Sequence, residues 1–193
     1  MRVKTAVTFF VVVTFVVATA ASVRPQSAAP TTTDAQIIAS AMSAAPKPVA
    51  DNATIVAMGK DGSMRVVRKG TNGYTCMPDT PTAPGPSAMC LDANAMEWAG
   101  AWMSHKAPPE KVGFMYMLAG GTDASNTDPY ATAPTAGNHW IKTGPHVMVV
   151  GPAVKSMPGY PKTADPDVTK PYVMWAGSPY EHLMIPMNAA PPK

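Results

Sequence analysis

Prolines divide this chain into short segments and so limit what it can fold into. The sequence holds 22 prolines in 193 residues, roughly twice the ~5% usage of average proteins. Proline is poorly tolerated in helix interiors and inner strands, so only short helices and strands fit between most of these breaks. Hydrophobic residues still make up 46% of the chain. We therefore expect ordered, proline-stiffened loops around a real core, with disorder confined to the ends.

The first twenty residues have the pattern of a secretory signal peptide. Arg2 and Lys4 precede an apolar run over residues 6–18, and Ala18-Thr19-Ala20 fits a signal-peptidase site. The run is shorter than the roughly 20 residues of a membrane-spanning helix, which predicts export rather than anchoring. The expected product is periplasmic or secreted after cleavage near Ala20. The expected divisions are a signal peptide (1–20), a flexible leader (21–33), a single α+β domain (34–187) and a flexible tail (188–193).

The charge of the chain restricts its partners. The formal net charge is +3, and loss of Arg2 and Lys4 would leave +1. A nearly neutral chain has no general electrostatic attraction for nucleic acid or for anionic lipid. We therefore expect no nucleic-acid partner and no integral membrane segment in the mature chain, and other partners stay unknown.

Two cysteines, Cys76 and Cys90, flank a segment rich in proline and glycine. In an oxidising compartment a disulfide between them would persist. Closing a loop of about 15 residues is worth roughly 3 kcal/mol in the chain-entropy model. No redox or nucleophile motif surrounds either residue, so we predict a structural disulfide. The alternative is a pair of free thiols at a metal site.

Apolar spacing predicts one main amphipathic helix after Asp92, which can cap it, and prolines 108 and 109 stop it. A shorter helix should begin with Asp34 as its N-cap and end before Pro46. Strands are predicted around an Asp-Gly hairpin in residues 53–69 and at residues 111–121, 145–151, 172–177 and 180–187. Pro186 indicates an edge position for the last of these. We expect an α+β fold: a single compact domain with a mostly antiparallel sheet of about six short strands and long proline-rich loops.

Two of the predicted strands contain histidine followed two residues later by methionine: His146 with Met148, and His182 with Met184. Alternate strand residues share a face, about 6.6 Å apart at the backbone. Thioether and imidazole groups suit Cu(I), so copper is the candidate cofactor. If the strands lie side by side in the right register, one face collects Met115, Met117, His146, Met148, Met174, His182 and Met184.

The alternative interpretation is that these residues are only core. Methionine fills irregular cores and packs well against aromatic rings. Trp98 and Trp102, on the predicted main helix, would be natural partners for such a face. The two interpretations differ in whether the imidazole and thioether atoms converge.

A long polar loop, residues 122–143, is a second candidate site. Its oxygen-bearing side chains at near-alternate positions resemble Ca²⁺ ligands, although the EF-hand spacing is missing. Turn-forming hydrogen bonds are the competing explanation. A hydrolase could instead combine Ser125 with His139 or His146 and a nearby aspartate, although no nucleophile motif is present. The candidate residues of this loop are Asp123, Ser125, Asn126 and Asp128.

Four stretches of the chain are distinctive: CLDANAMEWAGAWM (90–103), GFMYMLAGGTDASNTDPYA (113–131), TGPHVMVVG (143–151) and PYVMWAGSPYEHLMIP (171–186). Together they resemble a group of secreted bacterial proteins with no assigned function. The resemblance covers about residues 72–187. It implies export and a single compact domain, and it brings no activity, substrate or site.

The sequence thus leaves three classes of function open. The first is a non-enzymatic binding protein, with the methionine and histidine residues as its most testable site. The second is a hydrolase-like enzyme that uses residues 120–146. The third is a structural or envelope-interaction module without a small-molecule site.

Overall fold

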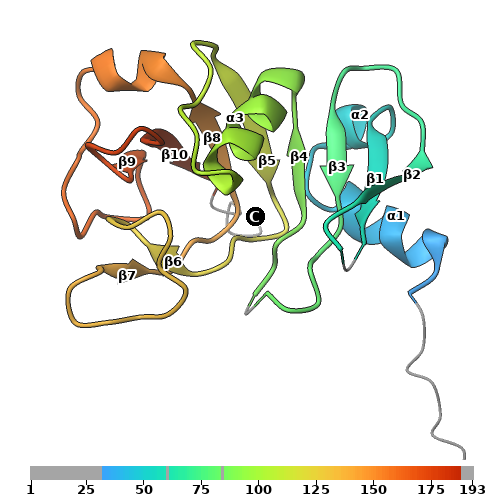
Figure 1. Ribbon diagram of the computed structural model, residues 1–193, viewed down its shortest axis with the longest axis horizontal. Helices are drawn as coiled ribbons and strands as arrows, with labels where there is room; N and C mark the ends of the chain where they lie inside the picture. The colour runs from blue at the N-terminus through green and yellow to red at the C-terminus, as the bar shows by residue number, and fades with distance from the viewer. Residues whose placement is uncertain (1–31, 60, 84, 188–193) are drawn as a thin grey trace, which may run out of the picture. The chain divides into compact units, whose positions relative to one another are not determined.

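An eight-stranded sheet organises the part of the chain that this computed structural model describes, residues 32–59, 61–83 and 85–187 (Figure 1). All its neighbouring strands run antiparallel except β1 and β3, which run parallel. In spatial order the strands are β2 (Met64–Arg68), β1 (Thr54–Met58), β3 (Thr75–Met77), β4 (Met89–Leu91), β5 (Gly113–Met117), β8 (His146–Val150), β10 (His182–Pro186) and β9 (Tyr172–Met174). The predicted signal peptide, most of the predicted leader and the predicted tail lie outside the described residues.

The predicted α+β class with a mostly antiparallel sheet is confirmed, but the strand count of about six is wrong. Besides the eight strands, β6 (Ala124–Ser125) and β7 (Trp140–Ile141) pair with each other as a second, two-stranded sheet. Both lie in the segment expected to be a polar loop. Strands of two or three residues show too little alternation to be recognised from sequence.

Three α-helices accompany the described strands: α1 (Asp34–Met42), α2 (Lys47–Ala50) and α3 (Ala93–Met103). A 3₁₀-helix, η1 (Pro152–Ser156), follows β8. The predicted main helix is confirmed as α3, with Asp92 as its N-cap. One Asp92 carboxylate oxygen accepts from the Ala95 amide at 2.8 Å. The other accepts from the Phe114 amide at 3.0 Å and so joins the start of α3 to β5.

The predicted cap of the first helix is wrong by one residue. Thr33 is the N-cap: its hydroxyl accepts from the Gln36 amide at 3.3 Å, and the Gln36 side chain accepts from the Thr33 amide at 2.8 Å. This reciprocal pair is a capping box, which satisfies two backbone donors at once. Asp34 instead occupies the first helical position and pairs with Arg65 of β2 at 2.6 Å.

The helices cover opposite faces of the sheet, as adjacent residues of β4 demonstrate. Cys90 packs in a cluster with Ile37 and Ala41 of α1. Leu91 packs in a second cluster with Ala95 and Trp98 of α3. Neighbouring strand residues point to opposite faces. Consequently α1 lies on one face and α3 on the other, and the α3 face carries the candidate site.

The predicted disulfide is confirmed. Cys76 of β3 and Cys90 of β4 are directly opposite in the antiparallel register and are bonded to each other. The described residues contain no free cysteine. The disulfide therefore links two three-residue strands covalently within the sheet.

The expected edge position of the strand carrying Pro186 is wrong. β10 lies between β8 and β9, not at an edge. Its pairing with β9 covers only residues 182–184, whereas its pairing with β8 extends to Pro186. Proline is tolerated at this position because β9 has already ended, so no neighbour on that side needs its missing N–H.

Candidate functional site

The residues predicted to share one face of the sheet do share it. β5, β8, β10 and β9 lie side by side, and their register aligns alternate residues on the side covered by α3. All seven side chains are buried, with at most 8% of any of them exposed. We call this surface the Met/His face, and it consists of Met115, Met117, His146, Met148, Met174, His182 and Met184.

The register fixes the neighbours of each residue on this face. Met148 lies at the centre, directly opposite Met115 on one side and Met184 on the other. His146 is opposite Met117 of β5. His182 is opposite Met174 of β9. Side chains directly opposite in an antiparallel pair have Cβ atoms about 4.5–5.5 Å apart, so each histidine has a thioether beside it on the next strand.

Both imidazole rings are held in the same way. Nδ1 of His146 lies 2.7 Å from the Gly144 carbonyl oxygen, and Nδ1 of His182 lies 3.0 Å from the Tyr180 carbonyl oxygen. A carbonyl only accepts, so Nδ1 carries the proton in each ring and donates it. Nε2 then presents its lone pair, and it has no hydrogen-bond partner among the described residues.

Burial keeps both histidines neutral at physiological pH. Burial lowers the pKa of His182 from 6.5 to about 4. Its bond to the Tyr180 carbonyl acts in the opposite direction, and a smaller electrostatic contribution from His146 also lowers the pKa. The pKa of His146 is also lowered, again by burial. A neutral imidazole with a free Nε2 lone pair is the form that binds a metal ion.

Aromatic rings from α3 and from the end of β9 cover the Met/His face. The His182 ring lies edge-on to Trp98 at 5.4 Å and to Trp175 at 4.8 Å between centroids. Trp98 stacks on Trp175 at 6.3 Å and meets Tyr180 edge-on at 6.2 Å. The methionines of the face belong to the same buried cluster as these rings. The face is therefore at once part of the hydrophobic core and the candidate site.

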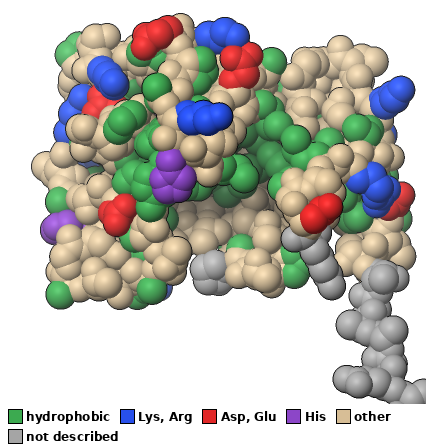
Figure 2. Space-filling model, viewed as in Figure 1, with side chains coloured by type: hydrophobic (Ala, Val, Ile, Leu, Met, Phe, Trp, Pro, Cys, Tyr) green, Lys and Arg blue, Asp and Glu red, His purple; other side chains and the backbone are tan. Residues whose placement is uncertain are grey.

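Beyond the edge of α3 the same surface is less deeply covered. Met77 and Met89, directly opposite in β3 and β4, are half-buried and pack against the cluster, as does Met96 of α3. Figure 2 shows hydrophobic side chains gathered in a hollow in the middle of the viewed face. Sequence reasoning missed Met77 and Met89. The cysteine spacing could have revealed them, since pairing Cys76 with Cys90 places Met77 opposite Met89.

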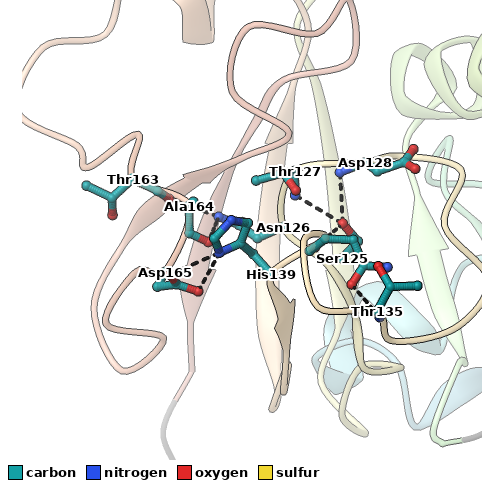
Figure 3. A network of polar contacts seen from close by, with 10 residues as sticks. Ser125, Asn126, Thr127, Asp128, Thr135, His139, Thr163, Ala164 and Asp165 are labelled. Atoms are coloured by element: carbon teal, nitrogen blue, oxygen red, sulfur yellow. Dashed lines mark hydrogen bonds and ion pairs between the residues drawn. The ribbon is translucent and has the colours of Figure 1, made fainter.

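Ser125 is engaged in local backbone contacts. Its hydroxyl donates to the Asn138 carbonyl and accepts from the amides of Thr127 at 3.2 Å and Asp128 at 2.8 Å (Figure 3). The side chain is 1% exposed. Asn126 donates to the carbonyls of Thr163 and Ala164 at 3.0 and 2.9 Å. These contacts are turn-forming and tie the loop to the segment after η1.

The other ionisable groups of this region do not gather around Ser125. His139 turns toward Asp165, with Nδ1 2.9 Å from the carboxylate (Figure 3). Asp128 accepts from the Tyr130 amide at 2.9 Å. In residues 32–59, 61–83 and 85–187, no three or more side chains of His, Cys, Asp or Glu group closely enough to hold a metal ion. The loop thus assembles neither the contacts of a catalytic triad nor a carboxylate-rich Ca²⁺ site.

A shallow hollow of about 420 Å³ lies on the surface near the start of β10. Its lining includes Lys155, Gly177 and the buried carboxylate of Glu181. Glu181 accepts from the Gly177 amide at 2.8 Å and from Lys162 at 3.1 Å. Those two contacts tie the turn before β10 to the loop that follows η1, which gives Glu181 a structural role.

Among the described residues, none of the helices has the length and apolar character of a membrane-spanning segment.

Comparison with protein-family models, with curated proteins and with solved structures finds no match to this chain. The geometry of the Met/His face is therefore the feature of the molecule that indicates a function.

Proposed function

We propose that the protein is an exported, non-enzymatic binding protein for a soft metal ion, Cu(I), held by imidazole and thioether groups of the Met/His face. The observation that carries this proposal is the matched state of His146 and His182. Each donates its Nδ1 proton to a backbone carbonyl and leaves Nε2 as the free lone pair. In metal sites the histidine nitrogen that does not bind the ion usually donates its proton to a carbonyl or carboxylate, which fixes the ring orientation.

The donor set of the face favours a soft ion. Thioether sulfur selects Cu(I), and neutral imidazole also binds copper well. Ca²⁺ and Mg²⁺ require oxygen ligands, and the Met/His face offers no carboxylate. The surrounding Trp98, Trp175 and Tyr180 rings exclude bulk water, which would stabilise Cu(I) against oxidation.

The disulfide supports the exported location in this proposal. A bond between Cys76 and Cys90 persists in an oxidising compartment and is rare in the reducing cytosol. The signal-peptide pattern in residues 1–20 points to the same location.

An anaerobic Cu(I) titration tests the proposed function. The protein, purified in the form that an exporting cell produces, competes with a chromophoric Cu(I) chelator under a mild reductant. We expect it to remove Cu(I) from the chelator, and we expect the His146→Ala/His182→Ala double variant to lose this ability. Circular dichroism checks that the variant is folded.

Methionine variants provide a second readout that leaves the histidines in place. Met148→Leu/Met184→Leu removes two thioethers with little change in side-chain volume, so the fold should survive while the affinity for Cu(I) falls by at least tenfold. Met58→Leu/Met64→Leu is the matched control, because those side chains are 45% and 55% exposed on β1 and β2. Copper affinity that is absent in the parent protein, or unchanged in the double-histidine variant, would mean that the face is only core.

A further inference from the structure

The two His-x-Met segments are related by a local two-fold axis. Met148 and Met184 are directly opposite in the antiparallel pair β8–β10. His146 precedes Met148 by two residues, and His182 precedes Met184 by two. Because the strands run in opposite directions, the two histidines lie at opposite ends of the central methionine pair.

This relation keeps the histidines apart. His146 is opposite Pro186, which is four residues along β10 from His182. At about 3.3 Å per residue, the two backbones are separated by roughly 13 Å along the strand direction. Metal–nitrogen bonds are about 2 Å long. In this register the Met148–Met184 pair lies between the two histidines, so the arrangement favours a separate ion at each imidazole over one ion shared by both.

The outer strands extend the two-fold relation and complete two separate ligand sets. Met117 of β5 is opposite His146, and Met174 of β9 is opposite His182. Each set then contains one imidazole, the methionine two residues later and the methionine across the strand. We call them the His146 set (His146, Met148, Met117) and the His182 set (His182, Met184, Met174).

We infer that the chain binds two Cu(I) ions, one in the His146 set and one in the His182 set, rather than one ion shared by the two His-x-Met segments. This inference rests on the proposed function and adds its stoichiometry and ligands. Each set offers one nitrogen and two thioether sulfurs, a donor combination that suits a soft ion.

The surroundings of the two sets are unequal. The His182 ring lies edge-on to both Trp98 and Trp175, and its set is at most 3% exposed. In the His146 set, Met117 is 7% and Met148 8% exposed. Met77 lies opposite Met89, and the register of β4 with β5, extended by one residue, places Met89 opposite Met117. A row of half-buried thioethers therefore connects the surface to this set. We therefore expect the His146 set to exchange its ion faster.

Single-histidine variants test the two-centre arrangement. Parent protein, His146→Ala and His182→Ala are titrated anaerobically with Cu(I) against the chelator, and bound ions are counted by native mass spectrometry. The expected counts are two ions for the parent and one for each variant. Cu(I) beside two indole rings should also change tryptophan emission. This change should persist in His146→Ala and disappear in His182→Ala.

Other outcomes overturn the inference in distinguishable ways. A single ion in the parent that either variant abolishes means one shared centre, which removes the inference and leaves the proposed function intact. Two ions retained in both variants place the copper elsewhere on the chain. No binding by the parent removes the proposed function as well. Met117→Leu and Met174→Leu, which keep the core volume, should each weaken one ion only and guard against a misfolded histidine variant.

Discussion

At the scale of single residues, His182 makes the stability of the folded protein depend on pH. Burial lowers its pKa from 6.5 to about 4. Between pH 6.5 and pH 4 the imidazole is protonated in the unfolded chain but not in the folded chain. The contribution of this difference to the free energy of unfolding is therefore fully present above pH 6.5 and is lost as the pH falls toward 4. The difference of about 2.5 pKa units corresponds to about 3 kcal/mol. Urea unfolding at pH 7.0, 5.5 and 4.5 should reveal this loss.

The control for this prediction replaces the titrating ring. His182→Asn should be less stable at pH 7 but should lose less stability between pH 6.5 and 5. His146, whose pKa is also lowered by burial, leaves a residual slope of the same sign. Equal slopes in the parent and in His182→Asn would mean that His182 is not the group responsible.

Gly121 is a second residue whose identity matters to the site. A Cβ at this position would lie 2.7 Å from Cε1 of His146 and would also meet the Thr143 side chain. Neither neighbour is free to move, because Thr143 donates to the Thr122 carbonyl and the imidazole is bonded to Gly144. We expect Gly121→Ala to cost about 1–3 kcal/mol in urea unfolding and to weaken the copper affinity of the His146 set.

Gly137 offers a matched control for the Gly121 variant. A Cβ at Gly137 meets nothing within 4 Å. Gly137→Ala should change the free energy of unfolding by less than about 0.5 kcal/mol, as is usual for surface substitutions. Similar effects of the two substitutions would contradict the close packing of His146 on Gly121.

The sequence predicted correctly which residues share a face of the sheet, because that depends only on the two-residue alternation of a strand. Alternation alone assigned His146 and Met148 to one face, and the structure agrees. It could not supply the cross-strand partners of the histidines, because register depends on turns and packing far along the chain. The sequence therefore placed Met117 and Met174 on the face but did not show which histidine each of them lies opposite.

At the scale of elements, α3 depends on its cap because Asp92 serves two elements. Its carboxylate accepts from Ala95 of the helix and from Phe114 of β5. Asp92→Ala removes both bonds, and we expect a loss of about 2 kcal/mol in urea unfolding. Asp92→Asn keeps one acceptor oxygen and should lose roughly half as much.

The cap of α1 is the comparison for this variant. Thr33→Ala removes an exposed capping hydroxyl that serves one helix only. It should cost about 0.5–1 kcal/mol. A larger effect at Thr33 than at Asp92 would contradict the view that Asp92 couples α3 to the sheet.

The elements that the sequence predicted well are those with many residues in a regular apolar pattern or with a clear N-cap residue. α3 follows from apolar spacing between Asp92 and the two prolines at 108 and 109. The sequence did not reveal that β1 pairs with β3 in parallel, nor that β6 pairs with β7. Parallel pairing leaves no turn signature, and two-residue strands have no measurable alternation.

At the scale of the whole molecule, the sheet joins two differently covered halves. β2, β1 and β3 pack beneath α1 and α2, whereas β5, β8 and β10 pack beneath α3. β3 and β4 connect the halves through only three register pairs, and the Cys76–Cys90 disulfide is the middle one. The bridge therefore lies at the junction between the two halves of the sheet.

Removing the bridge should weaken one half more than the other. Cys76→Ala/Cys90→Ala is expected to lower the free energy of unfolding by about 3 kcal/mol, the chain-entropy value for a loop of this length. Hydrogen exchange should accelerate most in β1 and β2, because that half packs around small alanines and lacks the tryptophan cluster that holds β8 and β10. Exchange followed by mass spectrometry resolves the two regions.

The Asp92→Ala variant is the control for this last prediction, because it destabilises the half beneath α3. It should accelerate exchange first in α3 and β5 and leave β1 and β2 closer to the parent. If both variants accelerate exchange equally in every strand, the sheet opens only as one cooperative unit. The disulfide would then stabilise the whole fold uniformly. Selective opening of β1 and β2 would instead mean that the Met/His face keeps its geometry after that half has loosened.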